Sequence, residues 1–204
     1  MRDIIDNLKY EKELLAQGYK LIAGADEVGR GPLAGPVVCA AVIMPLDDII
    51  DGVDDSKKLS EKKREMLYDK IMEKAIAVSI EAVDEKVIDE INILNATKRC
   101  MAAAINNLKV KPDIVFVDAL DGLDINVPEK AIIKGDALSY SIGAASIVAK
   151  VTRDRFMVEM DKKYPEYGFA KHKGYGTAMH MAALREHGAS AIHRQSFIKF
   201  LKDK

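Results

Sequence analysis

Four acidic residues stand where predicted strands and helices end or begin, which is where side chains of an α/β protein converge. Asp26 and Glu27 are adjacent, at the end of a predicted strand and just before a glycine-rich turn. Asp118 follows the apolar stretch DIVFV, and Asp136 comes just before a predicted helix. Neighbouring carboxylates repel each other unless a positive group lies beside them. The alternative is that each acid is an ordinary surface residue.

Strand ends and the loops beyond them gather in one crevice of an open α/β sheet. Four carboxylates converging there cannot all stay charged without cations, and their hard oxygen atoms suit Mg²⁺ or Mn²⁺. Two such ions about 3.5–4 Å apart can activate water and stabilise a leaving oxygen in phosphoryl chemistry. The positions of the four acids in the sequence are compatible with either a metal site or separate surface residues.

The stretch Gly29-Arg30-Gly31 allows two interpretations. Glycine lets the backbone approach a ligand closely, and an arginine between two glycines can face a phosphate or form a salt bridge. The same residues are equally typical of a tight turn between two strands. The surrounding sequence, GRGPLAG, lacks the Lys-Ser/Thr ending and the following helix of a P-loop, so ATP use has no support.

Two further segments could contact phosphates or sugars. Residues 55–60 contain two lysines, lead into a predicted helix and could place a lysine beside a phosphate, although helix capping by Ser60 explains the serine as well. Residues 171–176 place Tyr175 inside a basic loop broken by glycines, a combination that stacks on sugars or bases. Tyr175 is equally compatible with a core position that leaves its hydroxyl in water.

Hydrophobic periodicity indicates which elements position these residues. Strands are predicted at residues 20–25, 36–44, 75–83, 113–117 and 131–133. Helices are predicted after the caps Ser60 and Asp84, over 96–108, and after Asp136. The expected buried stripes are Met66, Leu67 and Ile71 in the first helix, and Ile142, Ala145, Ala149, Thr152, Phe156 and Met160 in the last, which is predicted to be amphipathic. This order indicates an α/β fold with a mixed sheet and a helical C-terminal appendage.

Composition excludes several classes of protein. With 204 residues, 49% hydrophobic and 31% charged, the chain can form one domain with a sizeable core. There is no apolar run of about 18 residues, so no membrane span is expected. The charged start MRDIIDNLKYEKELL does not resemble a signal peptide. Cys39 and Cys100 have neither metal-binding nor disulfide spacing, which fits a reduced, cytoplasmic compartment.

Charge is distributed unevenly along the chain. Residues 150–204 contain 12 Lys/Arg and 6 Asp/Glu, whereas the first 149 contain 19 and 26. All four histidines also lie in the basic part, and His193-Arg194 has no partner at metal-ligand spacing, so it is interpreted as structural. The asymmetry indicates either an anionic partner on one face or a solvated basic helix.

Taken together, these segments resemble the ribonuclease HII family, the type 2 ribonucleases H of bacteria. The similarity runs from about residue 20 to 198 through DEVGRGPLAGPV, DSKKLS, the VDA strand end, KGDALSYSIGAASIVAKVTRD and YGFAKHKGYGT…H…GASAIHRQSF. It implies an RNase H-like fold with a mixed five-stranded sheet flanked by helices. It also implies a catalytic domain over residues 1–160, with a helical basic C-terminal segment, 161–204, packed on it. Ala119 and Gly143 stand where the family commonly has Gly and Ala, which affects local packing rather than activity.

The resemblance implies an endoribonuclease that hydrolyses the RNA strand of RNA–DNA hybrids. It also implies nicking of duplex DNA 5′ to a single embedded ribonucleotide, leaving 3′-hydroxyl and 5′-phosphate ends. Mg²⁺ or Mn²⁺ is the implied cofactor, with two ions when substrate is bound, and a monomer is the expected state. The implied catalytic and metal-binding residues are Asp26, Glu27, Asp118 and Asp136. The implied substrate-binding residues are Gly29, Arg30 and Gly31 at the ribose 2′-hydroxyl, Lys57 at the scissile phosphate, and Tyr175 on the sugar, with Tyr164 and Tyr167 close to it in sequence.

Two other functions fit the same clustered acids. A junction resolvase of the same superfold would share the acids but would not need the GRG and KGY motifs. A nucleic-acid binding module without catalysis would keep the acids for structural reasons only. Cleavage of an all-DNA junction favours the first, and binding without Mg²⁺-dependent cleavage favours the second.

Overall fold

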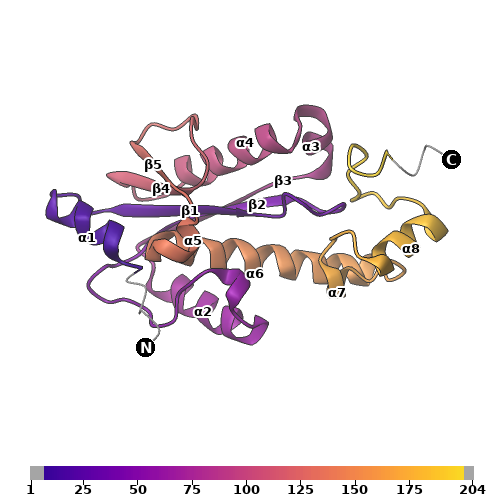
Figure 1. Ribbon diagram of the computed structural model, residues 1–204, viewed down its shortest axis with the longest axis horizontal. Coiled ribbons are helices and arrows are strands. Elements are labelled where there is room, and N and C mark those ends of the chain that lie inside the picture. Colours follow the sequence, from indigo (N-terminus) through magenta and orange to yellow (C-terminus); the bar gives the residue numbers. More distant parts are fainter. Residues whose placement is uncertain (1–6, 200–204) are drawn as a thin grey trace.

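In the computed structural model, which describes residues 7–199, a mixed five-stranded sheet lies between two layers of helices (Figure 1). The strand order is β3-β2-β1-β4-β5. The strands are β1 (Ile22–Val28), β2 (Val37–Ile43), β3 (Ala77–Val83), β4 (Ile114–Asp118) and β5 (Glu129–Ile132). β1, β2 and β3 pair antiparallel, whereas β4 is parallel to both β1 and β5. The predicted fold class is confirmed.

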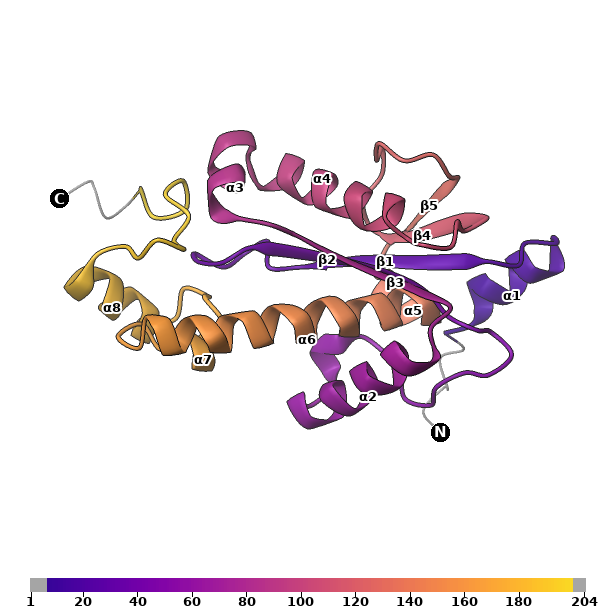
Figure 2. The same ribbon diagram turned by 180° about the vertical axis from the view of Figure 1, so that it is seen from behind.

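The helices are α1 (Lys9–Ala16), a 3₁₀ helix (Ser56–Lys58), α2 (Glu61–Lys74), α3 (Glu85–Ile91), α4 (Ile93–Asn106), α5 (Gly135–Leu138), α6 (Tyr140–Lys163), α7 (Phe169–His172) and α8 (Ala178–His187). Helices α3 and α4 lie on one side of the sheet, and α5, α6 and α2 lie on the other (Figure 2). Within residues 7–199, no helix combines the length and the apolar character needed to cross a bilayer.

The absence of a side chain at Gly24 lets α6 pack directly on the backbone of the central strand β1. Gly24 has no side chain, and a Cβ at this position would overlap the backbone of Ser141 in α6. The next residue of β1 on the same face is Asp26, because side chains alternate along a strand. The packing at Gly24 therefore places Asp26 against α6. The other face of β1 packs on α4 through the cluster that includes Ala23 and Ala25.

Helix caps agree with the sequence analysis, whereas two buried stripes do not. The Ser60 and Asp84 side chains accept hydrogen bonds from the first turns of α2 and α3, as predicted. Met66 is exposed, so the expected stripe of α2 is wrong at that residue. Phe156 is also exposed, and α6 is not amphipathic in its first half. That half lies between the sheet and α2, so residues on all its sides are buried.

The strand boundaries differ in one way that matters for the acids. β1 extends to Val28, so Asp26 and Glu27 lie inside the strand and not after it. Residues 29–36 connect β1 to β2, so the tight turn considered above is a longer β1–β2 loop. Asp136 precedes the long helix α6, as predicted, and itself lies in the first turn of the short helix α5.

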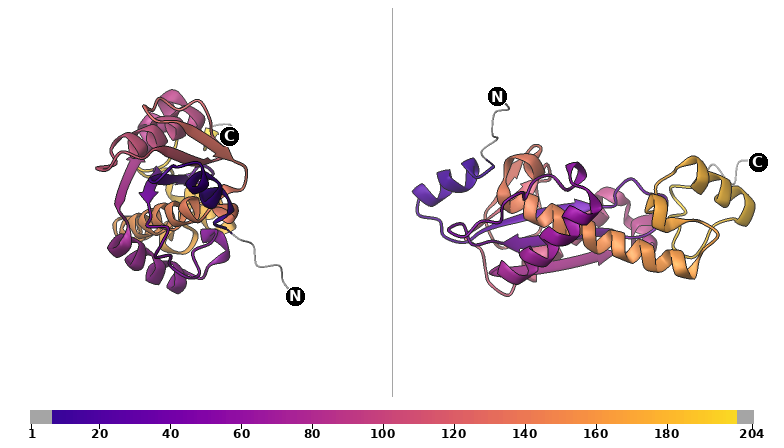
Figure 3. Two further views of the ribbon diagram at one scale, coloured as in Figure 1. Left: turned by 90° about the vertical axis from the view of Figure 1, so that its left-hand side faces the viewer. Right: turned by 90° about the horizontal axis from the view of Figure 1, so that it is seen from below.

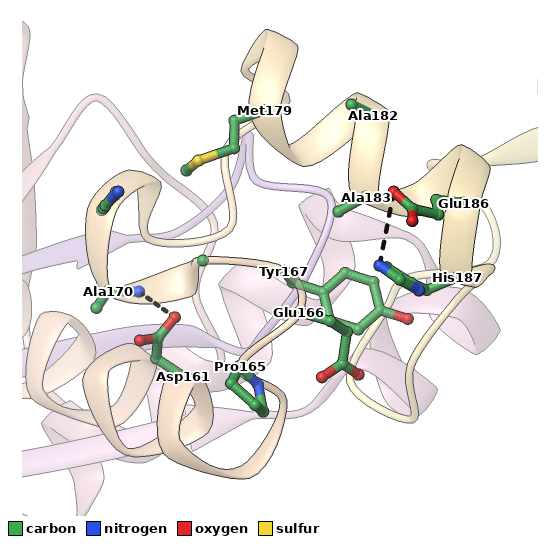
Figure 4. Close-up of a pocket in the computed structure, with 12 residues that line it drawn as sticks. Asp161, Pro165, Glu166, Tyr167, Ala170, Met179, Ala182, Ala183, Glu186 and His187 are labelled. Carbon is green, nitrogen blue, oxygen red and sulfur yellow. Dashed lines mark hydrogen bonds and ion pairs between the residues drawn. The ribbon is translucent and has the colours of Figure 1, made fainter.

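Residues 164–199 pack around the end of α6 that lies away from α1 (Figure 3). Their small core contains Met157 of α6, Ala34 of the β1–β2 loop, Phe169 and Leu184. The end of α6, α7 and α8 enclose a pocket that is lined by Asp161, Tyr167 and Ala170, among others (Figure 4). In this pocket the Ala170 N–H donates a hydrogen bond to the Asp161 carboxylate at 3.0 Å. None of the residues predicted to form the site lines this pocket.

Candidate active site

Three aspartates from different elements meet at the carboxyl ends of β1 and β4. One carboxylate oxygen of each of Asp26, Asp118 and Asp136 lies within 4.8 Å of the other two. The parallel pairing of β1 with β4 brings the first two together, and α5, directly after β5, supplies the third. The Gly135 N–H donates to Asp118 Oδ1 at 2.8 Å, which fixes that side chain toward α5.

Glu27 stands beside this group but is not part of it. Its side chain leaves β1 on the face opposite Asp26, because successive strand residues alternate. Arg30 Nη1 lies 3.4 Å from Glu27 Oε1, whereas Glu27 Oε2 is buried with no hydrogen-bond partner among the described residues. Burial raises the pKa of Glu27, and Arg30 offsets part of that rise. The structure thus brings together three of the four predicted carboxylates.

Burial and like charge make the ionised forms of these acids unfavourable. Burial is the largest cause of the raised pKa at Asp26, which lies well above its ordinary value, and the charges of Glu27 and Asp118 raise it further. Burial also raises the pKa of Asp118, and the charge of Asp136 adds to the effect. A set of carboxylates with raised pKa values is the electrostatic signature of a cation site, since a bound cation would remove the repulsion.

Lys57 supplies one positive charge to the group. Its Nζ lies 3.0 Å from Asp136 Oδ2, while 74% of the Lys57 side chain stays exposed. Burial alone would lower the pKa of Lys57, but its hydrogen bond to Asp136 and the nearby negative charges raise it overall. The lysine predicted from residues 55–60 is therefore at the acids, with its ammonium group accessible from solvent.

Ser146 lies beside Asp26 and is held by Ser56, and neither serine is among the predicted site residues. Ser146 on α6 forms a hydrogen bond to the Asp26 carboxylate, which lowers the pKa of that acid. The Ser146 hydroxyl lies 2.8 Å from the Ser56 hydroxyl, and both residues are buried. In the sequence, Ser146 is a small polar residue within an otherwise apolar segment of the predicted helix, and such a residue indicates a buried polar contact.

The β1–β2 loop and Tyr175 form a second surface. A Cβ at Gly31 would lie 3.7 Å from Tyr175 Cε1, so the ring and the loop backbone are neighbours. Tyr175 is 42% exposed. Among the described residues, no hydrogen bond is formed by the N–H groups of Arg30 or Gly31. Two free backbone donors and an accessible aromatic ring thus lie side by side.

The two glycines of this loop differ. Gly29 has φ +96°, and a Cβ there would overlap the side chain of Arg153 and lie 2.7 Å from the Pro36 carbonyl oxygen. Gly31 does not have a positive φ, and its Cβ would make only an ordinary contact with Tyr175. The backbone conformation therefore requires glycine at position 29 but not at position 31.

The other two tyrosines are not available in the same way. Tyr167 is buried, stacks on Phe169 and donates its hydroxyl to the Gly188 carbonyl oxygen at 2.9 Å. Tyr164 packs against the core of the C-terminal segment. Of the three candidates, Tyr175 alone lies at the β1–β2 loop with an exposed ring, which favours it over its sequence neighbours.

A mixed sheet in the order β3-β2-β1-β4-β5, with aspartates from β1, β4 and α5 gathered at one edge, defines an RNase H-like nuclease. The family model described as Ribonuclease HII matches residues 23–200. The chain belongs to the ribonuclease HII family, which cleaves the RNA strand of RNA–DNA hybrids, and it is a ribonuclease H enzyme. Divalent-metal dependence is a property of ribonucleases H, and the aspartate cluster fits it.

Similar proteins support this assignment over nearly the whole chain. A Ribonuclease HII of Acetivibrio thermocellus is 64% identical over 93% of this chain and 74% of the relative. A Ribonuclease HII of Caldicellulosiruptor bescii is 57% identical over 93% of this chain and 92% of the relative. Among solved structures, the ribonuclease H2 of Pyrococcus horikoshii OT3 matches with a TM-score of 0.75 and 29% identity, over 91% of this chain and 100% of that one. The family decides against both a junction resolvase and a binding module without catalysis.

Proposed function

We propose that the enzyme nicks duplex DNA 5′ to a single embedded ribonucleotide, in addition to cutting RNA–DNA hybrids, and leaves 3′-hydroxyl and 5′-phosphate ends. The observation that carries this proposal is the pairing of two surfaces. The aspartate cluster lies at one end of β1, and the free N–H groups of Arg30 and Gly31 follow the same strand. One sugar can therefore be read close to the acids that cut beside it.

The residues at the site fit Mg²⁺ or Mn²⁺. Asp26, Asp118 and Asp136 offer hard oxygen atoms within 4.8 Å of one another. Glu27 lies outside this group of three, but its buried Oε2 has no hydrogen-bond partner among the described residues and its carboxylate interacts electrostatically with Asp118, so we include it as a fourth ligand. Two bound ions would activate a water and stabilise the charge on the leaving oxygen. We assign both the metal-binding and the catalytic roles to these four carboxylates.

Three parts of the chain then act on the substrate. Lys57, held by Asp136 with its ammonium group in solvent, contacts the scissile phosphate. The backbone of residues 29–31 donates to the ribose 2′-hydroxyl, the one group that distinguishes RNA from DNA at a given sugar. Tyr175 packs on that sugar. We call residues 29–31 together with Tyr175 the ribonucleotide reader.

Residues 161–204 have the role of holding the duplex in this proposal, and residues 1–160 that of cutting it. The basic excess of the C-terminal third supports this division, because phosphate contacts by Lys and Arg supply most of the affinity for duplexes. The shared core around Met157 and Ala34 supports one functional unit, in which the segment is not an independent domain. The protein is proposed to act as a monomer.

A single incubation tests the proposal. A DNA duplex with one ribonucleotide, labelled at both ends of the cut strand, is mixed with the enzyme in Mg²⁺ or in EDTA. One Mg²⁺-dependent nick on the 5′ side of the ribonucleotide is expected, with a 3′ end that a polymerase extends directly. Cleavage of long hybrids together with an intact lone-ribonucleotide duplex contradicts the proposal.

Removing the Lys57 side chain is expected to slow cleavage without unfolding the protein. Lys57→Ala should reduce kcat by about 10²-fold, as for other single groups that stabilise transition-state charge. Stability should change by about 0.5 kcal/mol or less, because the Lys57–Asp136 pair is exposed on the lysine side. Single-turnover kinetics and thermal unfolding measure the two effects. Lys58→Ala is the matched control, since Lys58 forms an exposed pair with Asp54 at 3.2 Å, and a similar loss of kcat there would refute the role of Lys57.

Duplex affinity is expected to fall steeply with added salt, because phosphate contacts release condensed counterions. Lys171→Ala should weaken binding to all duplexes alike and lower the slope of log Kd against log salt by about 1. Lys171 is exposed and is a cleaner probe than Lys173, whose ammonium group donates to the Ala170 carbonyl oxygen. Binding is measured by anisotropy in Ca²⁺, with the exposed Lys109→Ala as control. A Kd independent of salt would exclude this mode of binding.

A further inference from the structure

His193 and Arg194 are neighbours in the chain, and they hold two separate parts of the molecule. Both are buried, with 2% and 0% of their surface exposed. Arg194 contacts the β1–β2 loop, whereas His193 is linked through His180 to the backbone of Tyr175. His193 and Arg194 are therefore connected by hydrogen bonds to both parts of the ribonucleotide reader, the β1–β2 loop and Tyr175. The sequence predicts only a structural role for this dipeptide.

Arg194 directs its hydrogen bonds to backbone carbonyl groups. Its guanidinium donates to the carbonyl oxygens of Gly29 (Nη2, 2.6 Å), Arg30 (Nη1, 3.0 Å) and Gly35 (Nε, 2.9 Å). No ion pair to a carboxylate is found for it among residues 7–199. These bonds turn two successive loop carbonyls toward the interior, and the N–H groups of Arg30 and Gly31 are left without a partner in the described chain. A planar guanidinium fits this task, since its five donors have a fixed geometry.

His193 reaches Tyr175 through a hydrogen-bonded series. The Ser190 N–H donates to His193 Nδ1 at 2.9 Å, and His193 Nε2 lies 2.9 Å from His180 Nε2. His180 Nδ1 lies 2.9 Å from the Tyr175 carbonyl oxygen. A carbonyl only accepts, so His180 carries its proton on Nδ1 and accepts at Nε2 from His193. Each ring is therefore neutral, with one tautomer that satisfies both of its nitrogens.

The surroundings of the two histidines keep them neutral. His180 stacks on His172 with ring centroids 4.5 Å apart, and the rings of Tyr167 and Phe169 pack around the pair. Burial, followed by the charge of His180, lowers the pKa of His193 to about 4. Burial also lowers the pKa of His180. At neutral pH the series is a fixed set of hydrogen bonds with no gain or loss of protons.

We propose that His193 and Arg194 are positioning residues that hold the backbone of residues 29–31 and Tyr175 at one separation, and that this separation sets the preference for a lone ribonucleotide. The inference rests on the function proposed above. A single sugar must meet both surfaces in one register. A continuous hybrid offers many registers, so it tolerates a displaced surface better. Neither residue belongs to the aspartate cluster, so metal binding does not depend on them.

Variants at Arg194 and His193 can change the hydrogen-bonding geometry of the side chain while keeping its charge or its volume. Arg194→Lys keeps the charge, but a single ammonium group cannot span three carbonyl oxygens. His193→Phe keeps the ring volume and removes the hydrogen bonds of the ring to His180, the Ser190 N–H and the Ser190 hydroxyl, whereas His193→Gln retains an amide donor for His180 and an acceptor for the Ser190 N–H. Arg99→Gln, at an exposed position on α4, is the control.

The experiment measures kcat/KM on a lone-ribonucleotide duplex and on a continuous hybrid, with Mn²⁺ affinity and thermal unfolding for each variant. Arg194→Lys and His193→Phe should lose about 10²-fold on the lone ribonucleotide, as for a displacement of about 1 Å, and a few-fold on the hybrid. Mn²⁺ affinity should not change. His193→Gln should restore the preference to within about threefold of the wild type, and ¹⁵N spectra should show His180 protonated at Nδ1 in both the wild type and this variant.

Equal losses on the two substrates, or a preserved preference in His193→Phe, overturn the inference. If Arg194→Lys does not fold, the comparison of His193→Phe with His193→Gln decides alone. A wild-type enzyme that cuts the hybrid but not the lone ribonucleotide refutes the proposed function itself. A wild type that cuts both, with variants that leave the ratio unchanged, refutes only the positioning role.

Discussion

Asp26→Asn is expected to reduce cleavage by about 10³-fold, since the site would lose about 4 kcal/mol of metal-assisted stabilisation of the transition state. The same change should raise the melting temperature of the metal-free protein. Asp26 is buried against Glu27 and Asp118, and its raised pKa reports how unfavourable its charge is there. Asparagine keeps the shape and the polar contacts and carries no charge. The Asp26→Asn variant should therefore be less active but more stable than the wild type in the absence of metal.

The gain in stability should depend on pH. Unfolded, Asp26 releases its proton near pH 3.9, whereas in the folded metal-free protein it holds the proton to a higher pH. As pH rises between these two values, folding stability falls, because the unfolded state has already lost the proton. The Asp26→Asn variant has no such loss, since its amide does not titrate. Thermal unfolding in EDTA should therefore show little advantage for the variant near pH 4 and a growing one toward neutral pH.

Adding Mg²⁺ should reduce the stability advantage of Asp26→Asn over the wild type, because a bound cation compensates the charge of Asp26 that only the wild type carries. Wild-type protein should gain more stability from Mg²⁺ than the variant does. Asp161→Asn is a matched control, since Asp161 accepts a hydrogen bond from Ala170 far from the three aspartates in the fold. Near wild-type cleavage by Asp26→Asn, or a variant that is less stable than the wild type in EDTA at neutral pH, would show that Asp26 is not in a cation site.

Gly31→Ala is expected to lower kcat/KM on a lone-ribonucleotide duplex by about 10²-fold, while the protein stays as stable as the wild type within about 0.5 kcal/mol. The loop accommodates a methyl group at this position, which would meet only Tyr175 Cε1 at 3.7 Å. The methyl group would instead stand between the loop backbone and the Tyr175 ring, where we propose that the sugar binds. The loss would therefore come from the substrate side.

Gly29→Ala provides the contrasting result. This residue has φ +96°, and its Cβ would overlap Arg153, so the variant should lose about 2 kcal/mol of stability together with activity on every substrate. Parallel kinetics and chemical unfolding distinguish the two glycines. Full activity of Gly31→Ala on the lone ribonucleotide would mean that the 2′-hydroxyl is read elsewhere.

The positions of the aspartates could be predicted because they follow from local patterns. A short apolar run rich in β-branched residues, such as residues 114–117, is typical of a buried strand, and Asp118 at its end is then expected at the edge of the sheet. The opposite direction of Glu27 does not follow from the sequence pattern. The expected strand ends at Ala25, whereas β1 continues to Val28, so the alternation of side chains that separates Asp26 from Glu27 becomes visible only in the structure.

Other parts of the site depend on contacts that no local pattern reveals. Arginine is rarely fully buried, and nothing near Arg194 in the sequence indicates that its partners are carbonyl groups of residues 29–35. Met66 belongs to an apparent apolar stripe, but α6 is placed so that only Leu67 and Ile71 of α2 are buried. Long-range packing decides such cases, and a single sequence contains no record of it.

The central place of β1 also has a consequence for synthesis on the ribosome. Its neighbour β2 follows at once in the chain, whereas its other neighbour, β4, starts at Ile114, and Asp136 comes later still. All three aspartates are therefore synthesised before Arg194, whose guanidinium holds the β1–β2 loop. Asp26 also needs α6, which packs on β1 at Gly24 and lies between the aspartates and Arg194 in the chain. Because a domain folds as a unit, the aspartate cluster and the loop become ordered together, after the residues that follow α6 have been made.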